Sequence, residues 1–310
     1  MVSLSDYAQI SAAFPWFFPL FVFVFGACVG SFLNVVIYRV PKHESVVTPG
    51  SHCGCGQPIA WYDNIPILSW LLLRGRARCC GRGFSFRYPF VELFTGGLFI
   101  ACWQSYPPLV AACGWVLLSC LVAASFIDID HMIIPDVFTL GLAAFGLVIS
   151  FLVPALHGHE TGYFLADSLR SGVASLQGIF IGSALVLWIA LIAESILKKE
   201  AMGFGDVTFV GAIGAFCGWQ GAVFTIFGGA FVGTVWVIFA KLVEIITSKK
   251  TPPPPDDLEP ESEDRAGFVP PLGFGAHIPF GPMLATAGAL YFLGLRGFVA
   301  EWFAQFTAIF

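Results

Sequence analysis

The sequence predicts an all-α polytopic membrane protein of about eight transmembrane helices, with a small cytoplasmic domain between the first and second helices. Hydrophobic residues make up 57% of the 310 residues and charged residues only 11%, whereas soluble domains carry roughly 25% charged residues. Apolar runs of roughly 20 residues, long enough to cross a bilayer as helices, recur along the chain. We therefore expect the lipid bilayer as its surroundings and no nucleic-acid partner.

The apolar runs define the elements in order. They predict spans at 14–38, 89–106, 108–127, 138–155, 172–195, 207–218, 220–246 and 277–296. Lys and Arg cluster in the loops after the first, fifth and seventh spans, and only Arg170 and Arg296 fall on the other side. Because basic residues are enriched in cytoplasmic loops, the loops after these odd-numbered spans are expected in the cytoplasm.

Five parts of the chain follow from this pattern. They are 1–41, the first transmembrane helix; 42–88, a cytoplasmic cysteine-containing domain; 89–247, a transmembrane core; 248–276, a disordered acidic linker; and 277–310, the last transmembrane helix and a tail. The linker is expected on the cytoplasmic side. It is rich in proline and acidic residues, so it cannot bury a core.

Two aspartates lie at span ends on the same predicted side of the membrane. Asp128 ends an apolar run, and Asp206 follows Gly203 and Gly205 in a Gly-Phe-Gly-Asp motif. A carboxylate at a membrane boundary is costly to desolvate and marks a functional site. The two glycines remove side-chain bulk, so an extended peptide backbone could approach. Two carboxylates in a partly dry site share a proton, giving the acid and the base of an aspartic protease.

Each aspartate also has an alternative interpretation. Asp206 alone could cap a helix, and Asp128 alone could pair with a basic side chain in the bundle. Asp130, His131 and Asp136 lie near Asp128 and compete for its role. A transporter or channel could use both carboxylates as proton or cation sites, although those would be expected nearer the bilayer midplane. A presenilin-like intramembrane protease would also use Gly-x-Gly-Asp.

Four cysteines stand apart from the apolar runs. Cys53, Cys55, Cys79 and Cys80 lie in the first polar loop. A cytoplasmic location disfavours structural disulfides, and tetrahedral thiolate sites suit zinc. The pairs Cys53-Gly54-Cys55 and Cys79-Cys80 depart from the usual Cys-x-x-Cys spacing, so free surface thiols remain the alternative.

Several motifs together resemble one known family, the bacterial type IV prepilin peptidases, which are GxGD membrane aspartic proteases and N-methyltransferases. The resembling stretches are 30–41, 63–70, 73–76, 87–93, 128–135, 203–206 and 279–282, so the similarity extends over nearly the whole chain. The family commonly has two Cys-x-x-Cys pairs. Here the first pair is one residue shorter, and Ala77 stands where the second would begin.

The resemblance implies a bifunctional enzyme of the bacterial inner membrane with its active site on the cytoplasmic side. It would remove the leader peptide of type IV prepilins or of type II secretion pseudopilins, with Asp128 and Asp206 activating the water. It would then methylate the new N-terminal residue with S-adenosylmethionine. Gly75 matches a position tied to methylation, and zinc is expected at the four cysteines. The resemblance implies no cofactor for proteolysis.

Overall fold

The computed structural model describes residues 12–198, 202–247 and 279–307. Most of these residues are helical, and within the described ranges β-structure is limited to two isolated bridges. The helices are α2 (Phe17–Arg39), η1 (Val40–Lys42), η2 (Trp61–Asn64), α3 (Leu68–Leu72), α4 (Arg87–Ser105), α5 (Pro108–His131), η3 (Asp136–Phe138), α6 (Leu140–Leu152), η4 (Pro154–His157), α7 (Phe164–Leu197), α8 (Phe204–Thr247), α9 (Gly281–Leu290), η5 (Tyr291–Leu295) and α10 (Arg296–Thr307). The predicted linker, 248–276, lies outside the described residues.

The predicted fold class is confirmed. Five helices of the described chain are long and apolar enough to cross a membrane, namely Phe17–Lys42, Pro108–His131, Phe164–Leu197, Phe204–Val243 and Gly281–Gln305. A shorter apolar helix covers Asp136–Leu152, and α4 covers the second predicted span. The chain is therefore an all-α polytopic membrane protein.

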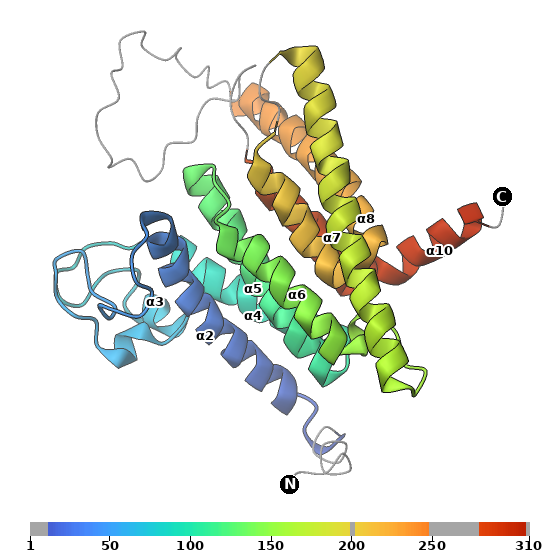
Figure 1. Cartoon of the computed structure of the whole chain (residues 1–310). Coiled ribbons are helices and arrows are strands. Elements are labelled where there is room, and N and C mark those ends of the chain that lie inside the picture. The colour runs from blue at the N-terminus through green and yellow to red at the C-terminus, as the bar shows by residue number, and fades with distance from the viewer. Residues whose placement is uncertain (1–11, 199–201, 248–278, 308–310) are drawn as a thin grey trace.

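The sixth and seventh predicted spans are the two arms of α8. Gly218 lies between them with φ 71° and ψ −179°, so the helix is broken there. A positive φ is available to glycine at little cost, because glycine has no Cβ. Figure 1 shows that the chain turns at this point and that the second arm leads back toward the end where the first began.

The helices α7 and α8 touch backbone to backbone. A Cβ atom on Gly178 would overlap the carbonyl oxygen of Gly214, and a Cβ atom on Gly214 would overlap the carbonyl oxygen of Gly178. Small residues let membrane helices approach this closely, which increases the van der Waals contact between them. This contact fixes the first arm of α8, which begins beside Asp206.

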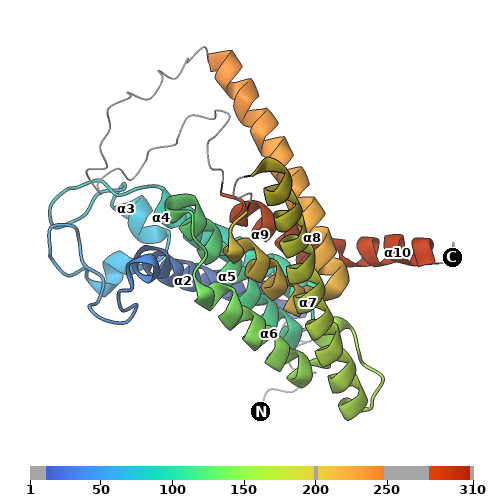
Figure 2. The ribbon, with the colours of Figure 1, turned by 45° about the horizontal axis from the view of Figure 1, so that its top comes forward.

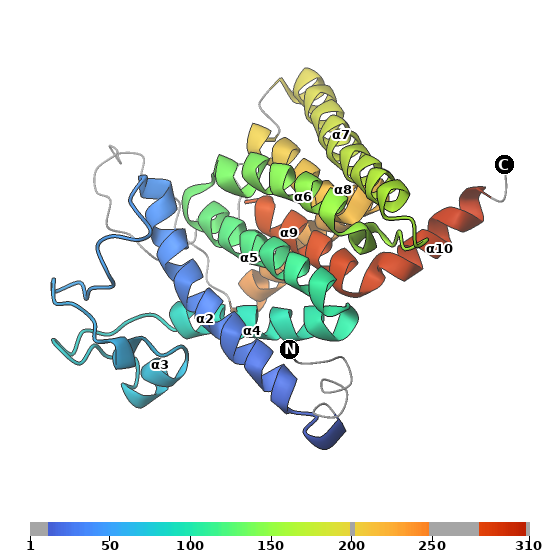
Figure 3. The same ribbon diagram turned by 60° about the horizontal axis from the view of Figure 1, so that its bottom comes forward.

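Helix α5 lies at the centre of the bundle. It packs against α2 and α4 on one side and against α6 and α9 on the other (Figure 3). Buried apolar residues along α5, including Leu117, Leu121 and Ile127, form part of the hydrophobic core. Asp128 follows this core directly, so the packing of α5 sets the depth of that carboxylate.

The segment between α2 and α4, residues 43–86, forms a loop domain beside the end of α2 (Figure 1). Its regular structure is limited to η2, α3 and the two bridges His52–Pro58 and Arg76–Gly83. At the other end of the chain, α10 points away from the bundle (Figure 2). The last predicted span therefore continues beyond residue 296 as a helix.

Candidate active site

Asp128 occupies the last turn of α5 and is the buried acid of its segment. Its side chain is only 6% exposed. Its Oδ2 atom accepts a hydrogen bond of 2.9 Å from the backbone N–H of Gly281, at the start of α9. The helix ends just beyond it, where Met132 has φ 55° and donates its N–H to the carbonyl oxygen of Asp128. The carboxylate is thus held between two helix ends that are far apart in sequence.

Asp206 occupies the first turn of α8 and is half-buried. Its backbone N–H donates to the carbonyl oxygen of Gly203 at 3.1 Å. Ile134 contacts the neighbours of both acids: a Cβ atom on Gly205, next to Asp206, would lie 3.5 Å from its Cβ, and one on Gly281, which binds Asp128, would lie 3.1 Å from its Cδ1. The structure therefore brings the two aspartates together.

Gly203 and Gly205 border an open approach to Asp206. Among the described residues, the only side chain within 4 Å of a Cβ atom on Gly203 would be that of Asp206, 3.9 Å away at Oδ2. A Cβ atom on Gly205 would be in ordinary contact with Ile134, at 3.5 Å. The space beside Asp206 is consistent with the approach of an extended peptide backbone.

The competing polar residues near Asp128 face elsewhere. Asp130 accepts two hydrogen bonds from Arg87 on α4, at 2.8 and 2.6 Å. His131 and Asp136 are exposed. Asp128 differs from all three in its burial and in its contact with α9.

Gly281 is a site residue that the sequence reasoning did not single out. A Cβ atom at this position would lie 2.7 Å from Oδ2 of Asp128 and 3.1 Å from Cδ1 of Ile134. Only glycine both donates its N–H to the carboxylate and leaves room for it. The signal in the sequence is its place between Phe280 and Pro282 at the start of an apolar run.

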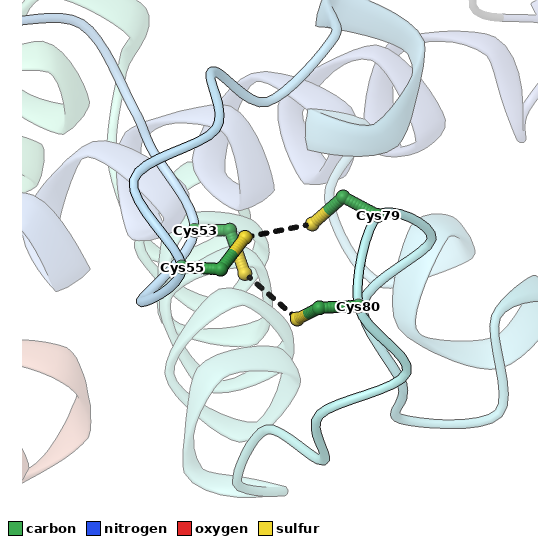
Figure 4. Close-up of side chains that lie close together, drawn as sticks. All are labelled: Cys53, Cys55, Cys79 and Cys80. Atoms are coloured by element: carbon green, nitrogen blue, oxygen red, sulfur yellow. Dashed lines mark hydrogen bonds between the residues drawn. The ribbon is translucent and has the colours of Figure 1, made fainter.

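The four loop cysteines form one cluster in the loop domain (Figure 4). Their Sγ atoms all lie within 4.8 Å of one another. Cys53 and Cys80 are 3.6 Å apart, and Cys55 and Cys79 are 3.4 Å apart. Four thiolates around zinc, with Zn–S bonds of about 2.3 Å in a tetrahedron, lie roughly 3.8 Å apart. The donor set fits a zinc ion despite the altered spacing.

Hydrogen bonds set the protonation of this cluster. The backbone N–H of Cys55, together with the neighbouring thiols, lowers the pKa of Cys53 to about 7. The pKa of Cys79 is raised to about 12 by its hydrogen bonds with Cys55 and Cys53. One thiolate is thus stabilised while a neighbour keeps its proton, and a bound cation would displace the remaining protons.

Gly75 lies in a turn of the loop domain with φ +67°. A Cβ atom on it would lie 3.2 Å from the indole of Trp70, and this indole donates a hydrogen bond to the carbonyl oxygen of Phe84. The position needs glycine for its conformation and for its close contact with Trp70.

Comparison with known proteins identifies relatives along most of the chain. Residues 24–106 match the Bacterial Peptidase A24 N-terminal domain. Residues 115–238 match the Type IV leader peptidase family. The comparison with solved structures finds no match.

Three of the similar curated proteins are each named prepilin leader peptidase/N-methyltransferase. The one from Myxococcus xanthus (strain DK1622) is 37% identical, over 82% of this chain and 70% of the relative. The one from Klebsiella pneumoniae is 36% identical, over 68% of this chain and 90% of the relative. The one from Aeromonas salmonicida (strain A449) is 32% identical, over 90% of this chain and 92% of the relative. The chain therefore belongs to the Type IV leader peptidase family.

Proposed function

We propose that this protein is a membrane-embedded aspartic endopeptidase that removes the leader peptide of type IV prepilins or of type II secretion pseudopilins. It also methylates the new N-terminal residue with S-adenosylmethionine. Family membership and the names of the relatives support both activities. The observation that carries the peptidase half is the placement of buried Asp128 and half-buried Asp206 at helix ends whose glycines, Gly281 and Gly205, both approach Ile134.

Asp128 and Asp206 are the proposed catalytic pair. One carboxylate takes a proton from a water molecule while its protonated partner donates a hydrogen bond to the peptide carbonyl. The Gly281 N–H fixes the rotamer of Asp128, so the acceptor oxygen points in one direction. Such positioning lowers the entropic cost of reaching the reactive geometry.

The proposed location is the inner membrane of a bacterium, with the dyad on the cytoplasmic side. The loop domain between α2 and α4 carries Arg74, Arg76, Arg78 and Arg82, and a cluster of this kind favours the cytoplasmic face. A prepilin would keep its apolar helix in the bilayer, and its basic leader would reach the dyad from the cytoplasm.

Two cofactors are proposed: zinc in the loop domain and S-adenosylmethionine for the methylation reaction. The four cysteines would hold zinc, which would tie the segment around Cys53 to the turn that carries Cys79 and Cys80. S-adenosylmethionine would supply the methyl group.

Reconstitution with substrate tests the proposal. The purified chain in lipid is incubated with a prepilin, with a pseudopilin and with S-adenosylmethionine, and the products are weighed by mass spectrometry. We expect a substrate shortened by its leader and carrying one added methyl group. An intact prepilin and an intact pseudopilin, with correctly inserted enzyme, would contradict the peptidase half and favour a transport role for the carboxylates.

A further inference from the structure

A short helix of the loop domain turns its leucines outward. Ser69 lies on the buried side of α3, whereas Leu68, Leu71 and Leu72 are exposed, Leu72 at 80%. Residues three and four positions apart lie together on a helix, so these three leucines share one face, which we name the α3 patch. A contiguous exposed apolar face marks an interaction surface, because a domain surrounded by water buries such residues.

The neighbouring helix η2 also exposes a large aromatic side chain. Trp61 is 81% exposed, and its ring makes an edge contact with the ring of Tyr62. The hydroxyl of Ser69 donates a 3.2 Å hydrogen bond to the carbonyl oxygen of Tyr62, so η2 is tied to α3. Tryptophan is enriched where proteins meet the boundary between lipid and water, because its ring is largely apolar and its N–H is polar.

The level of α3 along the membrane helices indicates what surrounds these side chains. Ile67, directly before α3, donates its backbone N–H to Oε2 of Glu92 at 2.7 Å. Glu92 lies five residues into α4, roughly 7–8 Å from its start at the rise of an α-helix. Helix α3 therefore begins beside α4 and not beyond its end.

The same level can be found on α2. A Cβ atom on Gly30 would lie 2.7 Å from the Cα atom of Glu92, so the two residues are side by side. Gly30 lies nine residues before Arg39, the last residue of α2, which is roughly 13–14 Å along an α-helix. Figure 1 likewise shows α3 alongside α2, short of the end of that helix.

We propose that the α3 patch and Trp61 are embedded in the bilayer leaflet on the side of the loop domain, which is the cytoplasmic leaflet in the proposed orientation. The hydrocarbon core of a bilayer is about 30 Å thick, and α2, with 23 residues, spans it with little to spare. A level well inside the end of α2 therefore lies within one leaflet, where lipid chains cover the leucines. The inference does not depend on either enzymatic activity.

The charges that follow the patch favour lipid over an apolar protein partner. Arg74 and Arg76 come directly after α3 and are exposed, and neither forms an ion pair with a residue that the structure describes. Arginine side chains reach from apolar surroundings to the headgroup phosphates, and basic segments beside a membrane attract anionic lipids. Leucines followed by arginines thus match the order of acyl chains and headgroups in a leaflet.

Photolabelling from the lipid tests the inference without any variant. The full chain is placed in bilayers that contain a phospholipid with a diazirine on its acyl chain, and the labelled peptides are located by mass spectrometry after irradiation. We expect label in residues 61–72 and in α7, whose exposed Phe180 and Trp188 serve as the lipid-facing reference. We expect none in the turn that carries Cys79 and Cys80. Label in α7 without label in residues 61–72 would overturn the inference.

A thiol-reactivity measurement gives the second test. Leu72→Cys is compared with Glu44→Cys, an exposed position of the same domain that is linked to the end of α2 by the hydrogen bond from its N–H to the Arg39 carbonyl oxygen. Both react with a water-soluble maleimide in open membrane fragments, where the reagent reaches both faces. Labelling is normalised to that after denaturation in sodium dodecyl sulfate, and the parent chain provides the background.

We expect Leu72→Cys to react at least about tenfold more slowly than Glu44→Cys, because the reactive thiolate does not form readily in hydrocarbon. Equal rates would place the α3 patch in water and overturn the inference. Slow reaction of Leu72→Cys without acyl-chain labelling of residues 61–72 would mean that a protein partner or a second copy of the chain covers the patch. That result would also overturn the assignment to the leaflet.

Discussion

At the residue scale, the carboxylate of Asp128 is positioned by a residue without a side chain. Gly281 donates its backbone N–H to Oδ2 of Asp128. A Cβ atom on Gly281 would lie only 2.7 Å from the same oxygen, which is too close for a methyl group. We predict that Gly281→Ala turns the carboxylate away and lowers the rate of prepilin cleavage at least about tenfold, because small displacements of a catalytic group are costly.

The matched control for this prediction is Gly297→Ala, since a Cβ atom on Gly297 would have no described atom within 4 Å. Both variants are assayed for cleavage after folding is checked by thermal unfolding. Full activity in a folded Gly281→Ala protein would show that the contact with α9 does not position Asp128.

Part of this site could be predicted from residue types alone. Asp128 and Asp206 are carboxylates at the ends of apolar runs, where their desolvation cost makes them conspicuous. Gly281 could not be predicted in the same way, because its contribution is a backbone N–H to a residue 153 positions away in sequence. Glu92 could not be placed from the sequence, since its hydrogen bond with the Ile67 N–H forms only after α4 and the loop domain have packed.

At the element scale, the contact between α7 and α8 depends on two glycines. We predict that Gly178→Ala lowers the melting temperature, because its Cβ atom would overlap the Gly214 carbonyl. Overpacking of this kind costs about 1–3 kcal/mol. The control is Gly97→Ala on α4, because a Cβ atom there would lie more than 4 Å from every other residue that the structure describes. If both variants had the melting temperature of the wild type, this result would contradict the close backbone contact between α7 and α8.

The cysteine cluster gives a prediction about metal content and pH. Zinc requires thiolates, and Cys53 ionises with a pKa of about 7. We therefore predict one zinc ion per chain at pH 8, with affinity falling as the pH drops because protons compete for the ligands, and falling more steeply below about 7, where Cys53 also binds a proton. Metal analysis across this pH range, with Cys55→Ser and Cys28→Ser compared at pH 8, measures this directly.

A four-thiolate site predicts that Cys55→Ser loses zinc and that Cys28→Ser keeps it, because Cys28 lies outside the cluster. Equal zinc in both variants would mean that the metal is held elsewhere. No zinc in the wild type would leave the four residues as surface thiols.

The helices themselves were largely predictable, and their ends were less so. The break between the predicted spans 207–218 and 220–246 coincides with Gly218, because a polar and glycine-rich turn interrupts the apolar run. Helix α7 begins eight residues before the predicted start at 172, at Phe164. Its first turns contain polar residues that are satisfied locally. Asp167, for example, accepts two hydrogen bonds from Thr161.

At the scale of the whole molecule, the count of spans places the loop domain and the turn before α7 on opposite sides of the membrane. We predict that Glu160→Cys reacts with an impermeant maleimide in intact cells. Val47 lies in the loop domain and is 78% exposed. We predict that Val47→Cys reacts only after the cells are permeabilised. The parent chain, with its native thiols, provides the background. The reverse labelling pattern would invert the proposed orientation.

The arrangement of the loop domain over α2 and α4 could not be read from the sequence. Its residues lack the periodicity of helices or strands, and its order comes from contacts such as the Arg78–Asp63 pair and the hydrogen bond from Ile67 to Glu92. Fold class follows from composition, whereas the level of α3 beside α2 and α4 depends on where these contacts hold the loops.

The central claim is that Asp128 and Asp206 together cleave the leader, and one experiment tests it most directly. Prepilin cleavage is measured in membranes for the wild type, Asp128→Asn and Asp206→Asn, with Asp136→Asn as an exposed acid outside the pair. Because acid–base groups contribute about 10²–10⁴-fold to rate, we predict at least that loss for the first two variants and wild-type activity for the third. Wild-type cleavage by a folded Asp128→Asn or Asp206→Asn protein would contradict the account.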